Sequence, residues 1–239
     1  MTPPLLRYRT VGSTMDLLHE LAAGGAEAGT VVVAGEQSEG RGSRGRTWRS
    51  PPGGLWLSVL YRPPAAGVEL VALRVGLAMA EAIEALGRGV TVALKWPNDL
   101  MLKDRKVGGI LCEARWQGDV LAWVVAGIGV NVTNTIPQEI GDRAVRLADV
   151  MAGATVEALE SEVTTRLRRL DLGTERLPPA ELTELRRRDW LLGRRLRGPV
   201  PGTAAGISDE GALLVRHEHG TVTTVRAGGV ELAQPSFTP

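Results

Sequence analysis

The hydrophobic positions between residues 13 and 192 follow two patterns, the spacing of helix faces and the short apolar runs of buried strands. Leu17, Leu18 and Leu21 lie at helical spacing between Ser13-Thr14 and Gly24, so we predict a helix with a hydroxyl N-cap and a glycine end. The same spacing predicts helices over 68–86, 156–170 and 180–192. Apolar runs predict strands over 30–34, 55–60, 90–96, 106–116 and 120–132.

Beyond Gly193 the pattern changes to short, closely spaced strand-like runs. These runs cover 203–207, 212–216 and 221–226, and turn residues such as Asp209-Glu210-Gly211 separate them. Close spacing with a turn between each pair predicts a small β-barrel. The expected fold class is therefore α+β, with a mixed, largely antiparallel sheet flanked by helices in residues 1–192 and a small all-β domain in residues 193–239.

Composition and charge narrow the classes of function. Lys and Arg number 28 against 27 for Asp and Glu, and a net charge of +1 argues against nonspecific nucleic-acid binding as the main task. Cys112 is the only cysteine and the three histidines are scattered, so we expect no disulfide, no protein-bound metal, and a reducing, cytoplasmic setting. Residues 1–10 lack a signal-peptide pattern, and the apolar run 120–132 is too short to span a bilayer.

The most unusual segment is residues 40–46, Gly-Arg-Gly-Ser-Arg-Gly-Arg, which we call the glycine–arginine loop. It lies in a stretch without hydrophobic period, and long loops inside compact domains tend to be functional. Its glycines match the dinucleotide pattern G-x-G-x-x-G, but residues 46–52 cannot begin the helix that a Rossmann site requires, and the Gly-Lys-Ser/Thr of a P-loop is absent. Two interpretations stay open: the arginines close on an anionic ligand, or they form a solvated basic surface.

A second unusual run covers residues 95–100, Lys-Trp-Pro-Asn-Asp-Leu. Pro97 cannot continue a strand ladder, so Asn98 and Asp99 are expected in a turn at the end of the sheet. Gly108 and Gly109 remove side chains at the start of the next strand, where a flat ligand could meet the backbone. Common turn chemistry explains Asn98 and Asp99 equally well, so only the combination of these features favours a binding site.

Six segments resemble, in order, the motifs of biotin protein ligases: residues 12–14, 37, 40–48, 95–100, 106–111 and 127–132. Residues 193–232 also resemble the small SH3-like barrel at the C-terminus of that family. The resemblance implies a catalytic fold of the class II synthetase and biotin ligase type. It further implies that the protein activates biotin with ATP to biotinyl-5′-AMP and transfers it to a lysine of a biotin carboxyl carrier domain.

The resemblance assigns roles to residues at matching positions. Attack of the biotin carboxylate on the α-phosphate brings two anions together, and Lys106 and Arg41 would offset their repulsion. Asp99 would accept or orient the proton of the acceptor lysine. Biotin binding is assigned to Ser13, Thr14, Gln37, Arg41, Gly42, Ser43, Lys106 and Gly109, and ATP binding to Arg41, Arg44, Trp48, Asn98, Lys106 and Asn131. Magnesium would accompany ATP, with no metal ligand assigned in the protein.

Ser43 departs from the family pattern, which usually has a further arginine in this loop. The loss of a cation near the adenylate is expected to weaken retention of the intermediate. Twelve residues precede Ser13, too few for the DNA-binding winged helix that some members carry, so we expect a monofunctional enzyme that does not bind DNA. No membrane partner is expected, and a homodimer is compatible with the resemblance.

Two alternatives remain. A lipoate or octanoate ligase shares the catalytic fold, but its loop pattern of Arg-Arg, Gly-Gly-Gly and His is absent. A degenerate biotin-binding or regulatory module would not need Lys106, Arg41 and Asp99 together. The acid that supports exchange of pyrophosphate into ATP distinguishes the first alternative, and labelling of a carrier domain tests the second.

Overall fold

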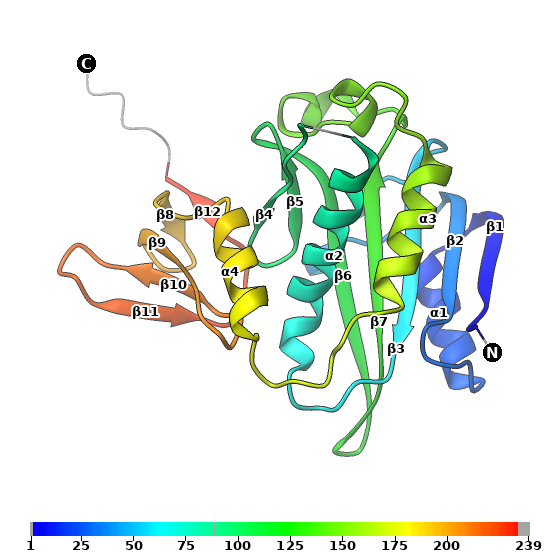
Figure 1. Cartoon of the computed structure of the whole chain (residues 1–239), viewed down its shortest axis with the longest axis horizontal. Helices are drawn as coiled ribbons and strands as arrows, with labels where there is room; N and C mark the ends of the chain where they lie inside the picture. The colour runs from blue at the N-terminus through cyan, green and yellow to red at the C-terminus, as the bar shows by residue number, and fades with distance from the viewer. Residues whose placement is uncertain (1, 88, 234–239) are drawn as a thin grey trace.

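The computed structural model describes residues 2–87 and 89–233, which form two β-sheets and four α-helices (Figure 1). The larger sheet has the strand order β1-β2-β3-β7-β6-β5-β4. Its neighbouring strands are antiparallel except for β1 and β2, which are parallel. The strands are β1 (Leu5–Val11), β2 (Val31–Gln37), β3 (Gly54–Tyr61), β4 (Ala93–Lys95), β5 (Asp99–Leu102), β6 (Arg105–Gln117) and β7 (Val120–Asn131).

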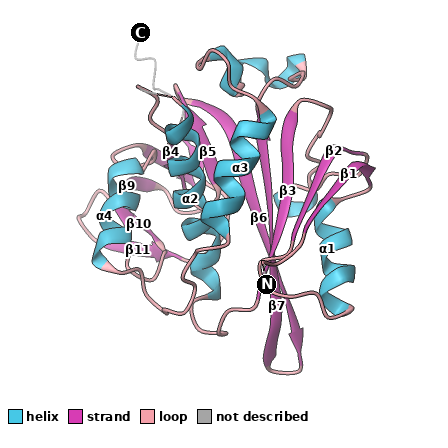
Figure 2. Cartoon of the chain, turned by 45° about the vertical axis from the view of Figure 1, so that its right-hand side comes forward, coloured by secondary structure: helices cyan, strands magenta, loops and turns pink. Residues whose placement is uncertain are grey.

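Helices cover both faces of the larger sheet. α2 (Val71–Leu86) and α3 (Val156–Leu167) lie on one face, and α1 (Thr14–Ala23) packs on the other (Figure 1, Figure 2). α4 (Pro179–Arg188) lies beside α2 and leads into the second sheet. Short 3₁₀ turns are η1 (Ser43–Gly45), η2 (Val68–Leu70), η3 (Gln138–Arg143) and η4 (Leu147–Asp149). Within the described ranges, every helix is too short or too polar to cross a membrane.

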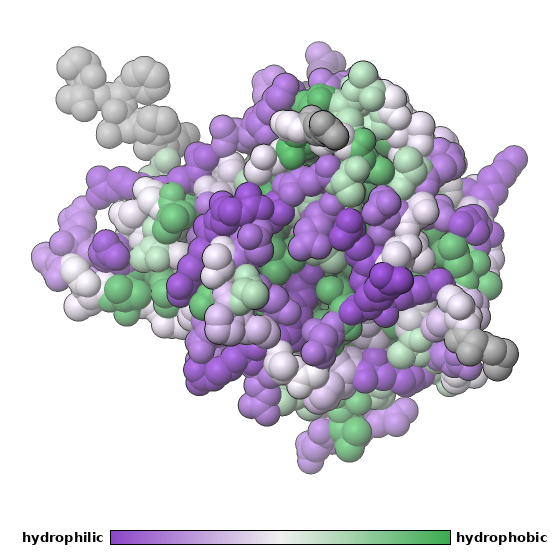
Figure 3. All heavy atoms as spheres, in the orientation of Figure 1, coloured by the Kyte–Doolittle hydropathy of each residue, from purple (hydrophilic) through white to green (hydrophobic). Residues whose placement is uncertain are grey.

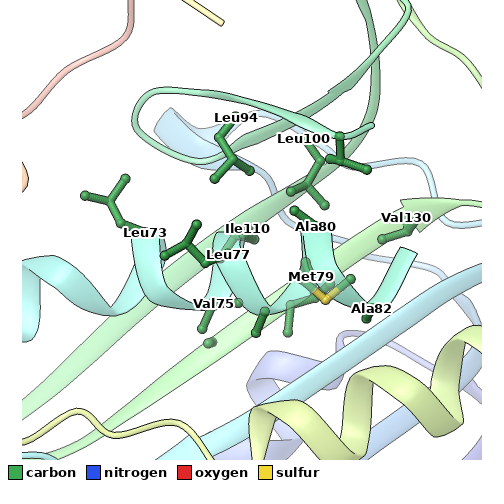
Figure 4. Close-up of a cluster of buried hydrophobic side chains, with 14 of the residues drawn as sticks. Leu73, Val75, Leu77, Met79, Ala80, Ala82, Leu94, Leu100, Ile110 and Val130 are labelled. Carbon is green, nitrogen blue, oxygen red and sulfur yellow. The ribbon is translucent and has the colours of Figure 1, made fainter. Parts of the chain in front are cut away.

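Alternation of side chains along the central strands divides the interior into two apolar layers. In β7, Val124 belongs to the layer beneath α2 and α3, whereas its neighbour Val125 belongs to the layer beneath α1. In Figure 4, Leu77 of α2 lies close to Leu94 and Ile110 of the sheet. Burial of each such side chain contributes about 1.5–3 kcal/mol to folding. The outer surface over α2 and α3 is hydrophilic on most of its area (Figure 3).

The predicted α+β class with a largely antiparallel sheet is confirmed, but two strands do not follow from the hydrophobic pattern. β1 is an edge strand with mostly exposed, polar residues, so it lacks an apolar face. β5 begins at Asp99, which was expected in the turn after Pro97. Because Lys95 pairs directly with Asp99 across the hairpin, residues 96–98 alone complete the reversal. The turn prediction therefore holds for Asn98 and is wrong for Asp99.

The second sheet is antiparallel and has the order β11-β10-β9-β8-β12. Its strands are β8 (Arg195–Gly198), β9 (Gly202–Ile207), β10 (Leu213–Arg216), β11 (Val222–Val225) and β12 (Glu231–Leu232). Over residues 193–233 the sheet does not close, so a barrel is not confirmed, and residues 234–239 lie outside the described part. Leu196 and Leu213 join the main apolar cluster, and Trp96 Nε1 donates to the Gly211 carbonyl oxygen at 2.9 Å. The two sheets therefore share one core.

A buried ion pair connects α2, α4 and the segment before β4. Arg188 is 4% exposed, and its terminal nitrogens donate to both carboxylate oxygens of Glu84, with 2.8 Å between Nη2 and Oε2. Arg188 Nη1 also donates to the Val92 carbonyl oxygen at 3.1 Å, and the Val92 N–H donates to Glu84 Oε1 at 2.8 Å. Burial acts to raise the pKa of Glu84, but the hydrogen bonds from Arg188 and Val92 outweigh it and hold the pKa below its ordinary value.

Candidate active site

A pocket of about 640 Å³ opens between the start of α1, the glycine–arginine loop and the β4–β5 hairpin. Its floor is formed by β6 and β7, where Gly109, Gly127 and Gly129 leave the backbone without side chains. Gly109 and Gly129 are direct partners across the two strands, so neither strand carries a side chain at this position of the sheet. A flat group of a ligand can therefore lie against this part of the sheet.

The indole of Trp48 covers part of this glycine floor. A Cβ on Gly129 would lie 2.6 Å from Trp48 Nε1, and a Cβ on Gly109 would lie 3.3 Å from the ring, so glycine allows the close approach. The indole N–H is buried without a hydrogen-bond partner among the described residues. Lys106 Nζ lies 5.0 Å from the ring centroid, within the range of a cation–π contact. Trp48 thus holds the glycine–arginine loop over the glycine floor, and its indole N–H can donate a hydrogen bond to a ligand.

Lys106 and Asp99 form an ion pair on the pocket wall, with 2.5 Å between Nζ and Oδ1. The pairing of β5 with β6 brings them together, because Asp99 begins β5 and Lys106 lies near the start of β6. Lys95 lines the same wall from β4. Burial is the main reason that the pKa of Lys95 lies below its ordinary value, and the nearby Asp99 acts in the opposite direction. The wall therefore places two amines beside one carboxylate.

Ser13 and Thr14 line the pocket at the start of α1. Ser13 occupies the N-cap position, but its hydroxyl makes no capping hydrogen bond, so the predicted hydroxyl cap is wrong. That hydroxyl is buried without a partner among the described residues. Thr14 instead donates from its backbone N and its Oγ1 to Gln37 Oε1, at 2.8 and 3.0 Å. The Ser13 hydroxyl is therefore a polar group that a ligand can satisfy, while Gln37 holds the first turn of the helix in place.

Arg41 enters the pocket from the glycine–arginine loop and contacts two carboxylates. Its Nη1 lies 2.9 Å from Glu113 Oε1, and its Nη2 lies 2.9 Å from Asp16 Oδ1 and 3.1 Å from Glu113 Oε2. Its Nε is buried and unpartnered among the described residues. Sequence reasoning missed both carboxylates, since Glu113 lies 72 positions from Arg41 and outside the motif that ends at residue 111.

Three further predicted residues also line the pocket: Gly42, Ser43 and Asn98. The Ser43 hydroxyl accepts a hydrogen bond from Arg46 Nη2 at 2.8 Å, so this part of the loop is braced by its own arginine. Asn98 donates from Nδ2 to the Ile110 carbonyl oxygen at 2.6 Å, which ties the β4–β5 turn to β6. The structure thus gathers most of the predicted site residues around one cavity.

Arg44 and Asn131 do not line the described pocket. Arg44 has a left-handed backbone, with φ 62°, and its guanidinium lies where a Cβ on Gly229 would be. Asn131 ends β7, where its Oδ1 accepts a hydrogen bond from Asn134 Nδ2 at 3.1 Å. Their roles in ATP binding stay predictions, and in this structure each contacts another part of the chain.

The rim beside the β4–β5 hairpin contains residues that sequence reasoning missed. Trp190, two residues after α4, lines the pocket and donates from Nε1 to Asp104 Oδ1 at 2.7 Å. Lys95 Nζ and Arg194 Cζ lie 5.5 and 3.9 Å from its ring centroid. Leu232 of the second sheet also lines the pocket. Only tertiary packing brings these late segments to the rim, because no motif marks them in the sequence.

Comparison with known protein families identifies the family of the chain that forms this pocket. The biotin/lipoate A/B protein ligase family matches residues 7–131, which is more than half of the chain. The chain belongs to this family. The matched region of this family member contains the glycine floor, the glycine–arginine loop and the pair formed by Lys106 and Asp99.

The similarity of this biotin/lipoate A/B ligase family member to its relatives covers most of its length. The chain is 32% identical over 247 residues to the bifunctional ligase/repressor BirA of Bacillus spizizenii, covering 95% of this chain and 74% of the relative. It is 30% identical over 235 residues to the biotin–[acetyl-CoA-carboxylase] ligase of Mycobacterium tuberculosis, covering 93% and 86%. The biotin protein ligase of Aquifex aeolicus in complex with biotin and ATP has a TM-score of 0.78 and 28% identity, covering 96% and 98%.

Proposed function

We propose that this chain is an ATP-dependent biotin protein ligase. In the first step a carboxylate oxygen of biotin bonds to the α-phosphorus of ATP, pyrophosphate leaves and biotinyl-5′-AMP forms. In the second step the amine of a lysine on a biotin carboxyl carrier domain attacks the acyl carbon, AMP leaves and the nitrogen loses a proton. The observation that carries the proposal is one pocket in which a bare glycine floor meets Lys106, Asp99 and Arg41.

The pocket supplies the groups that the first step requires. Lys106 and Arg41 bring positive charge to a site where a carboxylate and a phosphate must approach each other. The Ser13 hydroxyl at the start of α1 has no hydrogen-bond partner in the described part of the chain, so it can offer one to the ureido ring of biotin, beside Thr14. Trp48, lying on the glycine floor, would cover the adenylate and keep water from hydrolysing it.

Asp99 has a separate task in each step. Before the carrier enters, it pairs with Lys106 and thereby holds the amine on the pocket wall. When the carrier lysine enters, the Asp99 carboxylate is the group on that wall that would accept its proton. Removal of Asp99 should therefore slow transfer to the carrier as well as activation of biotin.

ATP binding rests on the same pocket. Trp48 and Asn98 line it, and Arg44 and Asn131 would join only if ligand binding moves them. The described residues contain no cluster of three His, Cys, Asp or Glu side chains that could hold a metal ion. Magnesium would enter with the triphosphate, since Mg²⁺ is commonly bound by substrate phosphates and one or two carboxylates.

The proposal extends to the acceptor and to the domains. Two relatives, from Mycobacterium tuberculosis and Paracoccus denitrificans, are named biotin–[acetyl-CoA-carboxylase] ligases, which supports a carboxylase carrier domain as the acceptor. We divide the chain into a catalytic domain, residues 1–192, and a C-terminal domain of SH3-like type, residues 193–239. The homodimer and the absence of DNA binding stay predictions, which sedimentation and a DNA-binding assay would test.

Exchange of labelled pyrophosphate into ATP tests the function directly. We expect exchange with biotin and a rate at least about 1,000-fold lower with lipoate or octanoate, because a site whose polar groups are placed for one ligand leaves them unpaired with another. A second incubation with labelled biotin, ATP and a carrier domain should label one lysine. Exchange with lipoate instead of biotin would favour the lipoate ligase alternative, and binding of biotin without exchange would favour a regulatory module.

The position of Ser43 leads to a prediction about retention of the intermediate. Ser43→Arg is expected to slow the release of biotinyl-5′-AMP by about tenfold or more, because a hydrogen bond to a charged group is worth about 1.5–3 kcal/mol. The measurement is the loss of labelled adenylate from the protein after an unlabelled chase. Ser38→Arg, at an exposed position two residues before the glycine–arginine loop, serves as the control. Equal release rates for Ser43→Arg and the unchanged protein would contradict the prediction.

A further inference from the structure

Behind Arg41 lies a partly buried series of hydrogen bonds that the proposed chemistry does not use. Trp123 Nε1 donates to His19 Nδ1 at 3.0 Å, and His19 Nε2 lies 3.2 Å from Glu113 Oε2. Glu113 then contacts both terminal nitrogens of Arg41. These hydrogen bonds connect β7, α1, β6 and the glycine–arginine loop, four segments that are distant in the sequence.

The donor and acceptor roles along this series follow from Trp123. An indole N–H can only donate, so His19 Nδ1 must be the acceptor and its proton must reside on Nε2. His19 is 8% exposed, and burial, assisted by the charge of Arg115, lowers its pKa below the ordinary value, although Glu113 acts in the opposite direction. A neutral His19 therefore donates from Nε2 to Glu113 and keeps that carboxylate in one orientation.

The orientation of Glu113 decides which nitrogens of Arg41 remain free. Glu113 and Asp16 occupy Nη1 and Nη2, whereas Nε is buried without a partner among the described residues. Strand alternation places Glu113 on the face that carries Gly109 and Leu111, two residues that line the pocket. The carboxylate is therefore anchored to the same rigid strand as the pocket floor, while Arg41 belongs to a loop.

We propose that Glu113 is a positioning residue that aims Arg41 into the pocket, and that His19, oriented by Trp123, holds Glu113 in place. The inference rests on the proposed function, because Arg41 is given its role by that proposal. A guanidinium held by two carboxylates is preorganised, and it meets an anionic ligand without having to be ordered at that moment. Loss of Glu113 would leave the positive charge of Arg41 in the loop, but the guanidinium would no longer be held toward the pocket.

Glu113→Gln tests the inference through its coupling to Arg41. We expect it to lower kcat/KM for biotin in pyrophosphate exchange by about 10- to 100-fold, since small misplacements of a binding group have effects of this size. In an Arg41→Ala background the same substitution should cause little further loss, because the group that Glu113 positions is already gone. Independent, multiplicative losses in the double variant would overturn the inference.

Variants of His19 separate positioning from general packing. His19→Phe keeps a ring beside Trp123 but cannot donate, so it should reduce kcat/KM in the same direction as Glu113→Gln. His19→Gln retains a nitrogen that can donate to Glu113 and should restore much of the loss. Glu160→Gln is the matched control, because Glu160 also pairs with an arginine, Arg7, and lies outside the pocket. Equal activity of His19→Phe and His19→Gln would contradict the role of His19.

A measurement that does not depend on catalytic activity distinguishes failure of this inference from failure of the proposed function. Trypsin cleaves after arginine, and the glycine–arginine loop contains three arginines. Glu113→Gln should increase cleavage within residues 40–46 several-fold in the absence of ligand, whereas Glu160→Gln should not. If the unchanged protein lacks biotin-dependent exchange, the proposed function fails while this result still reports on the loop. Unaltered cleavage of Glu113→Gln would overturn the positioning of Arg41.

Discussion

Lys106→Ala is expected to reduce biotin-dependent exchange of pyrophosphate into ATP by at least about 100- to 1,000-fold, the range observed when a preorganised charge-stabilising group is removed. Lys106 is held by Asp99 and lies over the Trp48 ring, so its ammonium occupies a defined place between the pocket wall and the floor. The carboxylate of biotin and the α-phosphate both need a positive partner at this point. Alanine removes that partner and breaks the close ion pair of Asp99, which leaves more negative charge on the pocket wall at the same step.

Two other lysine substitutions make the Lys106 experiment specific. Lys103→Ala changes the same residue type in the exposed turn between β5 and β6, outside the pocket, and should leave exchange unchanged. Lys106→Arg keeps the charge but not the geometry of the amine, so it should retain only part of the activity. Near-normal exchange by Lys106→Ala would exclude Lys106 from the first step.

Glu84→Ala should have the largest effect on stability, a loss of about 3–5 kcal/mol, because it removes the carboxylate that binds both terminal nitrogens of a buried arginine. Arg188 is 4% exposed and would keep the carbonyl oxygen of Val92 and the partly exposed carboxylate of Glu184, which lies 3.5 Å from its Nε. The pair holds α2, α4 and the entry to β4 together, so its loss affects the support of the β4–β5 hairpin. Urea denaturation measures the change directly.

The contribution of Glu84 should also depend on pH. Its pKa is lowered in the folded protein, because the hydrogen bonds from Arg188 and Val92 outweigh the effect of burial. A carboxylate with a lowered folded pKa stabilises the protein above its unfolded pKa and loses this contribution as the pH falls through the folded value. The difference in stability between the unchanged protein and Glu84→Gln should therefore shrink in acid.

Glu81 provides the matched control on the same helix. It lies one turn before Glu84 and pairs with Arg166 at 3.4 Å, but its side chain is 50% exposed. Glu81→Ala should cost no more than about 1 kcal/mol, the usual limit for exposed ion pairs. If Glu81→Ala and Glu84→Ala destabilised the protein equally, burial of the Glu84–Arg188 pair would not explain its effect.

Helices and central strands could be predicted because their side chains repeat at the period of the element. α2 and β7 bury long apolar runs and β6 buries Val107 and Ile110, and the predicted ranges of all three agree with the structure to within a few residues. β1 could not be predicted in this way, since an exposed edge strand is stabilised by its hydrogen bonds to β2 rather than by an apolar face. The closure of residues 193–239 into a barrel could not be decided from short strands alone, because closure depends on pairing between distant strands.

The sequence by itself determined the family resemblance, the cationic residues and Gly109 of the floor, because these depend on residue type and order along the chain. Only the tertiary structure decided how they are used. It paired Arg41 with Glu113, left the Ser13 hydroxyl without a partner among the described residues, and directed Arg44 toward Gly229. The physical reason is register: a shift of one residue reverses the face of every side chain on a strand, and no local pattern records which distant strand lies opposite.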